Sequence, residues 1–227
     1  MGQSQLPLGN VTRFGILGGS FNPIHVGHLS IAQQVQAELK LEKVFLLPAA
    51  TPPHKQNDPD LASAEDRLEM CRLAVRAMRG LEASDLELTR GGVSYTVETA
   101  RLLREAYGKD AEIRFIIGAD SVAELPTWYQ AKDLVALADF AIAARREQPL
   151  DEALWDRLRE AFGAEAVKRL QRGVVSVEKV DVSSTLIRKC LRAGEPIRGL
   201  LRKDVEHYIR AKGLYGARPA AGMARRP

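Results

Sequence analysis

Short apolar runs alternate with helical patterns along most of the chain, and this alternation restricts the fold more than any other feature. The first run, 13–17, leads through a glycine-rich turn to a helical pattern in which Leu29 and Ala32 lie on one face. A second run, 44–47, ends at Pro48. A strand, a helix and a strand in this order form a parallel pair. The sequence therefore predicts a single α/β domain with a doubly wound, Rossmann-like parallel sheet.

The alternation continues through the expected domain, which spans residues 1–216 and closes with C-terminal helices. Strands are expected at 85–89, 113–117, 140–144 and 174–177, and helices at 96–107, 130–136, 150–170 with a break near Gly163, 185–192 and 203–212. A further helix begins near Ser63, which can form a capping pair with Asp66. Gly194 and Gly213 are expected to end the last two helices.

The net charge of +4 is concentrated at the end of the sequence and does not by itself indicate a nucleic-acid partner. Residues 217–227 carry three arginines and no acid, so they account for three of the four excess positive charges. We expect a flexible, solvated basic tail here, because its apolar content is too low for packing. RNA binding through this tail is the alternative.

Composition restricts the class of protein further. The sequence has no run of about 18 apolar residues, which a membrane-spanning helix requires. The N-terminus lacks the basic and apolar regions of a secretory signal. Cys71 and Cys190 both fall in helical patterns, and we interpret them as reduced core residues. These features predict a cytoplasmic protein without a membrane partner, and they leave self-association through helix faces open.

The loop after the first strand, GGSFNPIHVGH at 18–28, has the residues of a phosphate-binding loop. Gly18 and Gly19 allow the backbone to approach an anion and to adopt a positive φ. The next helix begins within this segment, so its free N–H groups face the same place. His25 and His28, three residues apart, can each donate a hydrogen bond to a phosphate oxygen. A zinc site lacks a third ligand nearby in sequence, and a purely structural role is the other alternative.

The loop after the second strand, PAATPPHK at 48–55, offers a cation at a matching position. Its prolines restrict the backbone, so Lys55 is held at low entropic cost. A lysine at the carboxyl end of a strand in the same sheet suits a triphosphate. An ordinary surface turn is the alternative for this segment alone.

A third segment, VSSTLIR at 182–188, begins a helix near the end of the domain. Ser183 and Ser184 are candidate N-cap residues. The free N–H groups, the hydroxyls of Ser184 and Thr185, and Arg188 one turn later can converge on an anion, and the arginine can bind phosphate in a bidentate manner. The alternative is a well-capped helix with a surface arginine.

The segments 18–28 and 182–188 resemble the two signatures of the HxGH nucleotidyltransferase superfamily, whose members join a nucleotide to a phosphate-bearing acceptor and release pyrophosphate. Asn22 departs from the aspartate that many members carry. Three further stretches are similar to motifs of the bacterial nicotinate-mononucleotide adenylyltransferases: the proline-rich loop ending at Lys55, SYTVET at 94–99, and IGADS at 117–121 followed by TWY at 127–129. The resemblance extends over about residues 13–216.

The resemblance implies adenylyl transfer from ATP to nicotinate mononucleotide in NAD biosynthesis, with Mg²⁺ entering with ATP. It assigns catalysis to His25, His28, Lys55 and Arg188. It assigns ATP binding to Gly18, Gly19, Ser20, Phe21, His25, His28, Gly118, Asp120, Ser184, Thr185 and Arg188. It assigns the acceptor to Ser20, Phe21, Lys55, Thr96, Trp128 and Tyr129, and it places Arg145 or Arg146 near the adenine.

Side-chain chemistry agrees with these assignments. Trp128 and Tyr129 offer flat faces to a cationic pyridinium ring. Thr96 can hold the ring carboxylate, and Asp120 can accept a hydrogen bond from a ribose or the adenine amine. Half-buried packing of Trp128 and helix capping by Asp120 are the structural alternatives. For the whole chain, the alternatives are another HxGH transferase with a nicotinamide mononucleotide or phosphopantetheine acceptor, and a non-catalytic nucleotide-binding protein.

Overall fold

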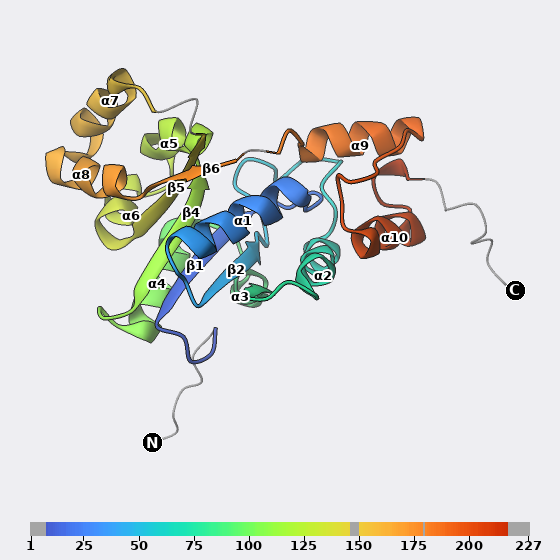
Figure 1. The fold of residues 1–227 in the computed structure, drawn as a ribbon, viewed down its shortest axis with the longest axis horizontal. Helices are drawn as coiled ribbons and strands as arrows, with labels where there is room; N and C mark the ends of the chain where they lie inside the picture. Colours follow the sequence, from blue (N-terminus) through green and yellow to red (C-terminus); the bar gives the residue numbers. More distant parts are fainter. Residues whose placement is uncertain (1–7, 146–149, 179, 218–227) are drawn as a thin grey trace, which may run out of the picture.

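The computed structural model describes residues 8–145, 150–178 and 180–217, and these residues contain one parallel sheet of six strands (Figure 1). The strand order is β3-β2-β1-β4-β5-β6, and every pair is parallel. The strands are β1 (Arg13–Gly19), β2 (Lys43–Pro48), β3 (Leu81–Ala83), β4 (Glu112–Gly118), β5 (Asp139–Arg145) and β6 (Val174–Val177). This is the doubly wound order in which the winding reverses between β1 and β4, so the predicted fold class is confirmed.

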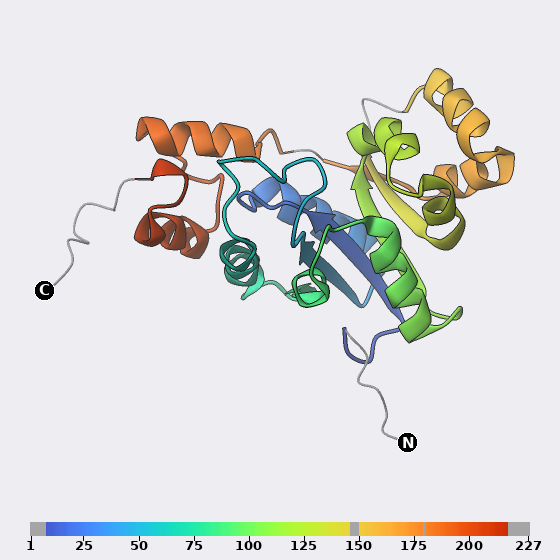
Figure 2. The same ribbon diagram turned by 180° about the vertical axis from the view of Figure 1, so that it is seen from behind.

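Helices cover both faces of the sheet. They are α1 (Val26–Glu38), α2 (Ala64–Val75), α3 (Leu86–Arg90), α4 (Thr96–Tyr107), α5 (Ala119–Glu124), α6 (Ala131–Leu137), α7 (Glu152–Phe162), α8 (Ala164–Arg172), α9 (Ser184–Ala193) and α10 (Lys203–Lys212), with short 3-10 turns η1 (Leu125–Thr127) and η2 (Leu214–Gly216). One apolar cluster joins α1, α2, α9 and α10 to the sheet, and the other joins α4, α6, α7 and α8. Figure 2 shows α4 crossing the face opposite α1.

Strand β2 shows how the sequence produces two cores. Val44 and Leu46 belong to the α1 cluster, whereas Phe45 and Leu47 belong to the α4 cluster. Successive side chains of a strand point to opposite faces, so a strand covered on both sides is apolar at consecutive positions. The short unbroken apolar runs in the sequence are therefore the buried strands of a parallel sheet.

Most helix boundaries follow the signals in the sequence. The Ser63 hydroxyl accepts a hydrogen bond from the Asp66 N–H at 3.0 Å, which confirms the predicted cap of α2. Gly194 and Gly213 end α9 and α10 with φ values of 71° and 64°. Glycine adopts this left-handed conformation without steric cost. The predicted break near Gly163 separates α7 from α8.

The strand predicted at 85–89 is wrong, because this segment forms the short helix α3. The third strand lies just before it, at Leu81–Ala83. The pattern LEL imitates a half-buried strand, but Glu87 is the buried residue of the three. Its carboxylate accepts a hydrogen bond from the Thr99 hydroxyl at 2.7 Å, and this contact with α4 determines which side of the segment is covered.

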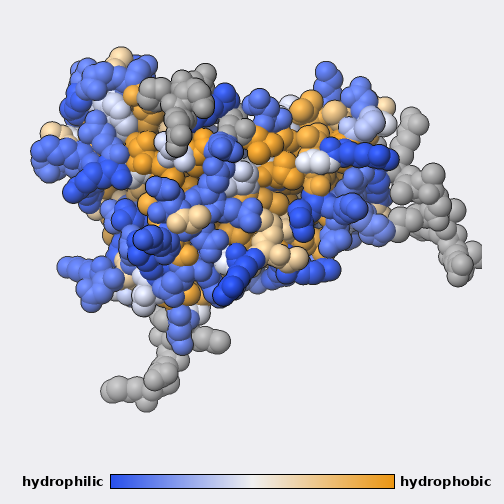
Figure 3. Space-filling model, in the orientation of Figure 1, coloured by the Kyte–Doolittle hydropathy of each residue, from blue (hydrophilic) through white to orange (hydrophobic). Residues whose placement is uncertain are grey.

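The surface of the molecule is mixed. Figure 3 shows apolar residues exposed in the middle of one face, over α1 and toward α9, with hydrophilic residues gathered at both ends. Cys71 and Cys190 are free thiols buried in α2 and α9. Within the described ranges, no helix combines the length and the hydropathy that crossing a bilayer requires. Of the predicted tail 217–227, only Ala217 falls within the described residues.

Candidate functional site

The candidate site lies where the carboxyl ends of β1, β2, β4 and β5 meet. The winding of the sheet reverses between β1 and β4, and in sheets of this kind ligands bind at that position. The loop from Gly19 to α1 leaves the end of β1 at this point. The expectation that Gly18 and Gly19 adopt a positive φ is wrong, because the left-handed residue of this loop is Phe21, with φ of 44°. Gly18 is instead an exposed residue near the end of β1, with open space where a Cβ would lie.

The two histidines lie against each other at the start of α1. His25 is the N-cap residue, and its ring centroid lies 3.7 Å from that of His28, with the planes 22° apart. The backbone N–H of His25 donates to Nδ1 of His28 at 3.3 Å. Because Nδ1 accepts this bond, the neutral His28 ring carries its proton on Nε2. That N–H is the donor which His28 can offer to a ligand.

Burial keeps both imidazoles neutral. It lowers the pKa of His25 to about 4. Burial, with a smaller contribution from the neighbouring His25, lowers the pKa of His28 to about 3. Nδ1 of His25 is buried, and within the described residues no hydrogen bond satisfies it. The pair therefore offers neutral N–H donors rather than positive charge, until an anion arrives to raise these pKa values.

Gly27 allows the start of α1 to pack closely against the segment before α9. A Cβ at this position would lie 2.9 Å from Cγ1 of Val182 and 3.1 Å from Nδ1 of His25. At such distances even a methyl group would force the Val182 side chain to move, so a glycine here allows the close contact between the two signature segments.

The second signature segment is bonded directly to the first. Ser183 caps α9 by accepting from the Leu186 N–H at 3.1 Å, as predicted. The Ser184 hydroxyl donates to the Pro23 carbonyl at 2.8 Å, and Nη1 of Arg188 donates to the Asn22 carbonyl at 2.9 Å. The two segments thus form one structure, although about 160 residues separate them.

Arg188 is buried rather than a surface arginine, with 8% of the residue exposed. Its Nε lies 3.9 Å from a carboxylate oxygen of Asp60 and has no hydrogen-bond partner among the described residues. The guanidinium therefore fixes the first loop through one nitrogen and retains donors for a ligand. Thr185 lies exposed in the first turn of α9.

Asn22 is fully buried, and its three hydrogen bonds explain why an amide occupies this position. Its Oδ1 accepts from the Ala62 N–H at 3.0 Å and from the Tyr215 hydroxyl at 2.8 Å. Its Nδ2 donates to the Asp60 carbonyl at 2.9 Å. An aspartate could replace the acceptor but not the donor. Burial raises the pKa of Tyr215, so its hydroxyl remains a donor.

Lys55 reaches the same loop from the end of β2. Its Nζ donates to the Ser20 hydroxyl at 3.3 Å. Ser94, which belongs to the motif at 94–99 but was given no role from sequence, connects the loop after β2 to the start of α4. Its hydroxyl accepts from the Ala50 N–H at 2.8 Å, and its N–H donates to the Thr51 carbonyl at 2.9 Å. The predicted Lys55 is thus placed between the first loop and the segment that carries Thr96.

Thr96, Trp128 and Tyr129 line one pocket of about 480 Å³, together with residues that the sequence did not single out, among them His54 and Glu124. Thr96 is the first residue of α4, where backbone N–H groups are unpaired. Tyr129 is 48% exposed, and its ring lies 4.2 Å from that of Tyr95, with the planes 30° apart. Trp128 is half-buried against the α4 core. Adjacency to Lys55 was the signal that could have identified His54.

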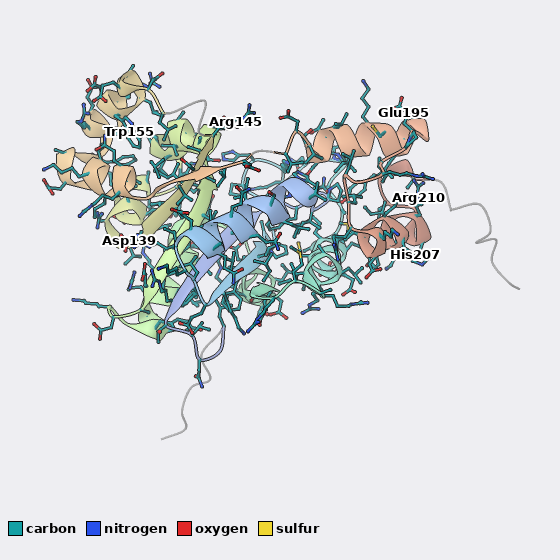
Figure 4. The ribbon with its side chains drawn as sticks, in the orientation of Figure 1. Asp139, Arg145, Trp155, Glu195, His207 and Arg210 are labelled. Carbon is teal, nitrogen blue, oxygen red and sulfur yellow. The ribbon has the colours of Figure 1, made fainter. Side chains whose placement is uncertain are left out.

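A second, smaller cavity of about 230 Å³ lies at the ends of β4 and β5. Gly118, Asp120 and Arg145 line it, together with Ile31 of α1, the helix that begins at the histidines. Figure 4 shows Arg145 at this edge of the sheet, beside α5. Arg146, the other arginine considered for this region, lies outside the described residues.

A metal centre built from protein side chains finds no support in the described parts of the chain. No three His, Cys, Asp or Glu side chains there gather as ligands of a metal ion. The donors that surround the first loop are imidazole, ammonium, guanidinium and backbone N–H groups, which suit oxygens of an anion.

Comparison with known proteins agrees with this geometry. Residues 16–190 match the family described as Cytidylyltransferase-like. The chain is 40% identical over 218 residues to the probable nicotinate-nucleotide adenylyltransferase of Desulfatibacillum aliphaticivorans, covering 89% of this chain and 99% of the relative. It is 41% identical over 215 residues to the protein of the same name from Syntrophotalea carbinolica, covering 89% and 97%.

Solved structures share the fold. The nicotinic acid mononucleotide adenylyltransferase of Plasmodium falciparum, complexed with NaAD, superposes with a TM-score of 0.71 at 19% identity, over 90% of this chain and 98% of that one. A putative nicotinate-nucleotide adenylyltransferase from Vibrio parahaemolyticus gives 0.62 at 19% identity, over 89% and 94%. The chain therefore belongs to the cytidylyltransferase-like family and, within it, to the nicotinate-nucleotide adenylyltransferases.

Proposed function

We propose that the chain transfers the adenylyl group of ATP to nicotinate mononucleotide, giving deamido-NAD and pyrophosphate. One observation carries this proposal: the histidine loop and the start of α9 are hydrogen-bonded to each other, and Lys55 and Ser94 connect this pair of segments to the pocket lined by Thr96. The names of the relatives, and the NaAD bound by the Plasmodium falciparum protein, support the same pair of substrates.

In this reaction an oxygen of the acceptor's 5′-phosphate attacks the α-phosphorus of ATP, and the bond to the bridging oxygen breaks as pyrophosphate leaves. A phosphate monoester has its second pKa near about 6, so the nucleophile is already largely dianionic at neutral pH. No general base is needed, and the work of the protein is alignment and charge stabilisation.

The neutral rings of His25 and His28 would each donate one N–H to the ATP phosphates, with one of them facing the charge that develops at the α-phosphorus. Lys55 and Arg188 would hold the departing β- and γ-phosphates. The hydroxyl of Ser184 already donates to Pro23, so we assign its contact with the anion to the backbone N–H at the start of α9, together with Thr185.

The remaining parts of the two substrates would occupy the two cavities. The adenine would lie at the smaller one, near Gly118, Asp120 and Arg145. The pyridine ring would stack on Trp128 or Tyr129, with its carboxylate at Thr96. Ser20 and Phe21, in the loop after β1, would contact both substrates.

Mg²⁺ would enter with ATP and offset the negative charge of the leaving pyrophosphate. No carboxylate cluster is available in the described ranges, so phosphate oxygens and water would supply most of its ligands. We further propose that the reaction takes place in the cytoplasm and needs no nucleic-acid partner.

A coupled assay of pyrophosphate release tests the proposal. Nicotinate mononucleotide, nicotinamide mononucleotide and phosphopantetheine are compared as acceptors at saturating MgATP. We expect the highest kcat/KM with nicotinate mononucleotide. A higher kcat/KM with phosphopantetheine would overturn the proposed acceptor, and no release with any acceptor would favour a non-catalytic nucleotide-binding protein.

A further inference from the structure

Arg67 of α2 is a charged side chain in the core, with 1% of the residue exposed. Its guanidinium donates three hydrogen bonds: Nη1 to the Ser20 carbonyl at 3.0 Å, Nη2 to the Ala50 carbonyl at 3.1 Å, and Nε to the Ala62 carbonyl at 3.0 Å. Burial lowers the pKa of this guanidinium, but an arginine keeps its proton at any physiological pH.

The three acceptors lie in two connections, the one from β1 to α1 and the one from β2 to α2. Ser20 lies in the loop after β1, Ala50 in the loop after β2, and Ala62 in the segment that leads into α2. All three acceptors are main-chain carbonyls rather than carboxylates. Among the described residues no carboxylate lies within ion-pair distance of the guanidinium, although Glu65 and Glu87 act on it from farther away. A buried charge without a close counter-ion is costly for folding, so this arginine would be a poor choice if packing alone were required.

Both connections carry groups of the proposed site, each one hydrogen bond away from a residue that binds the guanidinium. Ser20 accepts from Nη1 of Arg67 through its carbonyl and from Nζ of Lys55 through its hydroxyl. Ala50 accepts from Nη2 of Arg67 through its carbonyl and donates through its N–H to the hydroxyl of Ser94, two residues before Thr96. Arg67 is therefore connected to the loop for the ATP phosphates and to the wall of the acceptor pocket.

We propose that Arg67 is a positioning residue that fixes the separation between the loop holding ATP and the loop leading to the acceptor. This inference rests on the function proposed above. The planar fork of a guanidinium holds two carbonyls at a set distance and direction, whereas a lysine ammonium is a single point with flexible reach. In-line transfer depends on that separation, since a displacement of about 1 Å between reacting groups costs about 10²-fold in rate.

Two substitutions test the proposal, each with a control in the same helix. Arg67→Lys keeps the charge and loses the fork, and Arg67→Met loses both. Arg72→Lys and Arg72→Met are the controls, because Arg72 is exposed on α2 and, of the residues that the structure describes, its only ion-pair partner is Asp85 at 3.2 Å. Rates are measured well below the melting temperature of each variant, and they are divided by the folded fraction from circular dichroism.

We expect both Arg67 variants to lose about 10- to 100-fold in kcat, with KM for ATP and for nicotinate mononucleotide within about threefold of the unsubstituted protein. The Arg72 variants should stay within about twofold in all three constants. A change confined to KM, or a folded Arg67→Lys protein with unaltered kcat, overturns the proposal. If neither Arg67 variant folds, Ser94→Ala decides: we expect a lower kcat at unchanged KM for ATP, and an unchanged kcat overturns the proposal.

Hydrogen–deuterium exchange separates this inference from the proposed reaction. Arg67→Lys should exchange faster than Arg72→Lys in both 18–25 and 48–55, because both loops lose a fixed contact. Unchanged exchange in these two segments overturns the positioning role whatever the reaction is. An unsubstituted protein that releases no pyrophosphate, combined with faster exchange in both segments, refutes the proposed function but not the positioning of the loops.

Discussion

Mild acid should destabilise this protein through His25 and His28. Both rings are neutral in the folded state, with pKa values lowered to about 4 and about 3, whereas an unfolded imidazole titrates near 6.5. Below pH 6.5 the unfolded chain binds two protons that the folded chain does not, so stability falls as pH falls. At about 1.4 kcal/mol per pH unit and per ring, acidification to about pH 5 costs roughly 2 kcal/mol for each histidine, or about 4 kcal/mol for the pair.

Thermal unfolding followed by circular dichroism between pH 7.5 and pH 5 measures this loss. A free-energy change of about 4 kcal/mol lowers the melting temperature of a chain of this size by roughly 10 °C. The double variant His25→Gln, His28→Gln is the matched control and should lose much less over the same range. Carboxylates with lowered pKa, such as that of Asp66, contribute only at more acidic pH. An equal loss in the unsubstituted protein and the double variant would refute the reasoning.

Three other substitutions give separate expectations. His28→Ala should lower kcat for pyrophosphate release by about 10²–10³ with the fold retained, because a preorganised donor is lost; a normal kcat would contradict that role. Gly27→Ala should destabilise the protein by about 1–3 kcal/mol in thermal unfolding, since the new methyl group would meet the Val182 side chain at 2.9 Å; an unchanged melting temperature would show that the two segments can separate freely. Tyr215→Phe should cost about 1 kcal/mol of unfolding free energy, because Oδ1 of Asn22 loses one of its two donors; a neutral effect would argue against that hydrogen bond.

The fold could be predicted because its signals are local. Buried parallel strands are short apolar runs, and the caps at Ser63, Gly194 and Gly213 act within a few residues. The strand predicted at 85–89 was wrong because the deciding contact is not local. Its apolar pattern fits a strand, but a contact of Glu87 with Thr99 on another helix determines its exposure. Tertiary contacts override local pattern in such short segments.

The sequence predicted the motifs of the candidate site but not the buried hydrogen bonds that hold those motifs in place. The histidine loop, Lys55 and the start of α9 are recognisable because their residue types suit phosphate. The hydrogen bonds of Asn22 and Arg67 cannot be recognised in this way, because their partners lie up to 193 positions away along the chain. One signal was available: Arg67 lies one turn before Cys71, on the side of α2 that packs into the core. A charged residue on the apolar face of a helix indicates a buried side chain whose polar atoms are hydrogen-bonded.

Ser184, Arg188 and Tyr215 all donate hydrogen bonds to the first loop. During synthesis, the sheet can therefore form before the protein is able to bind ATP. All six strands are complete by Val177, so the sheet can assemble while these residues are still inside the ribosome. The loop after β1 leaves the ribosome early, but its hydrogen-bond partners on α9 and at Tyr215 leave it last. A nascent chain arrested with residue 180 just outside the exit tunnel should thus contain the sheet but not bind ATP, whereas the released chain should do both.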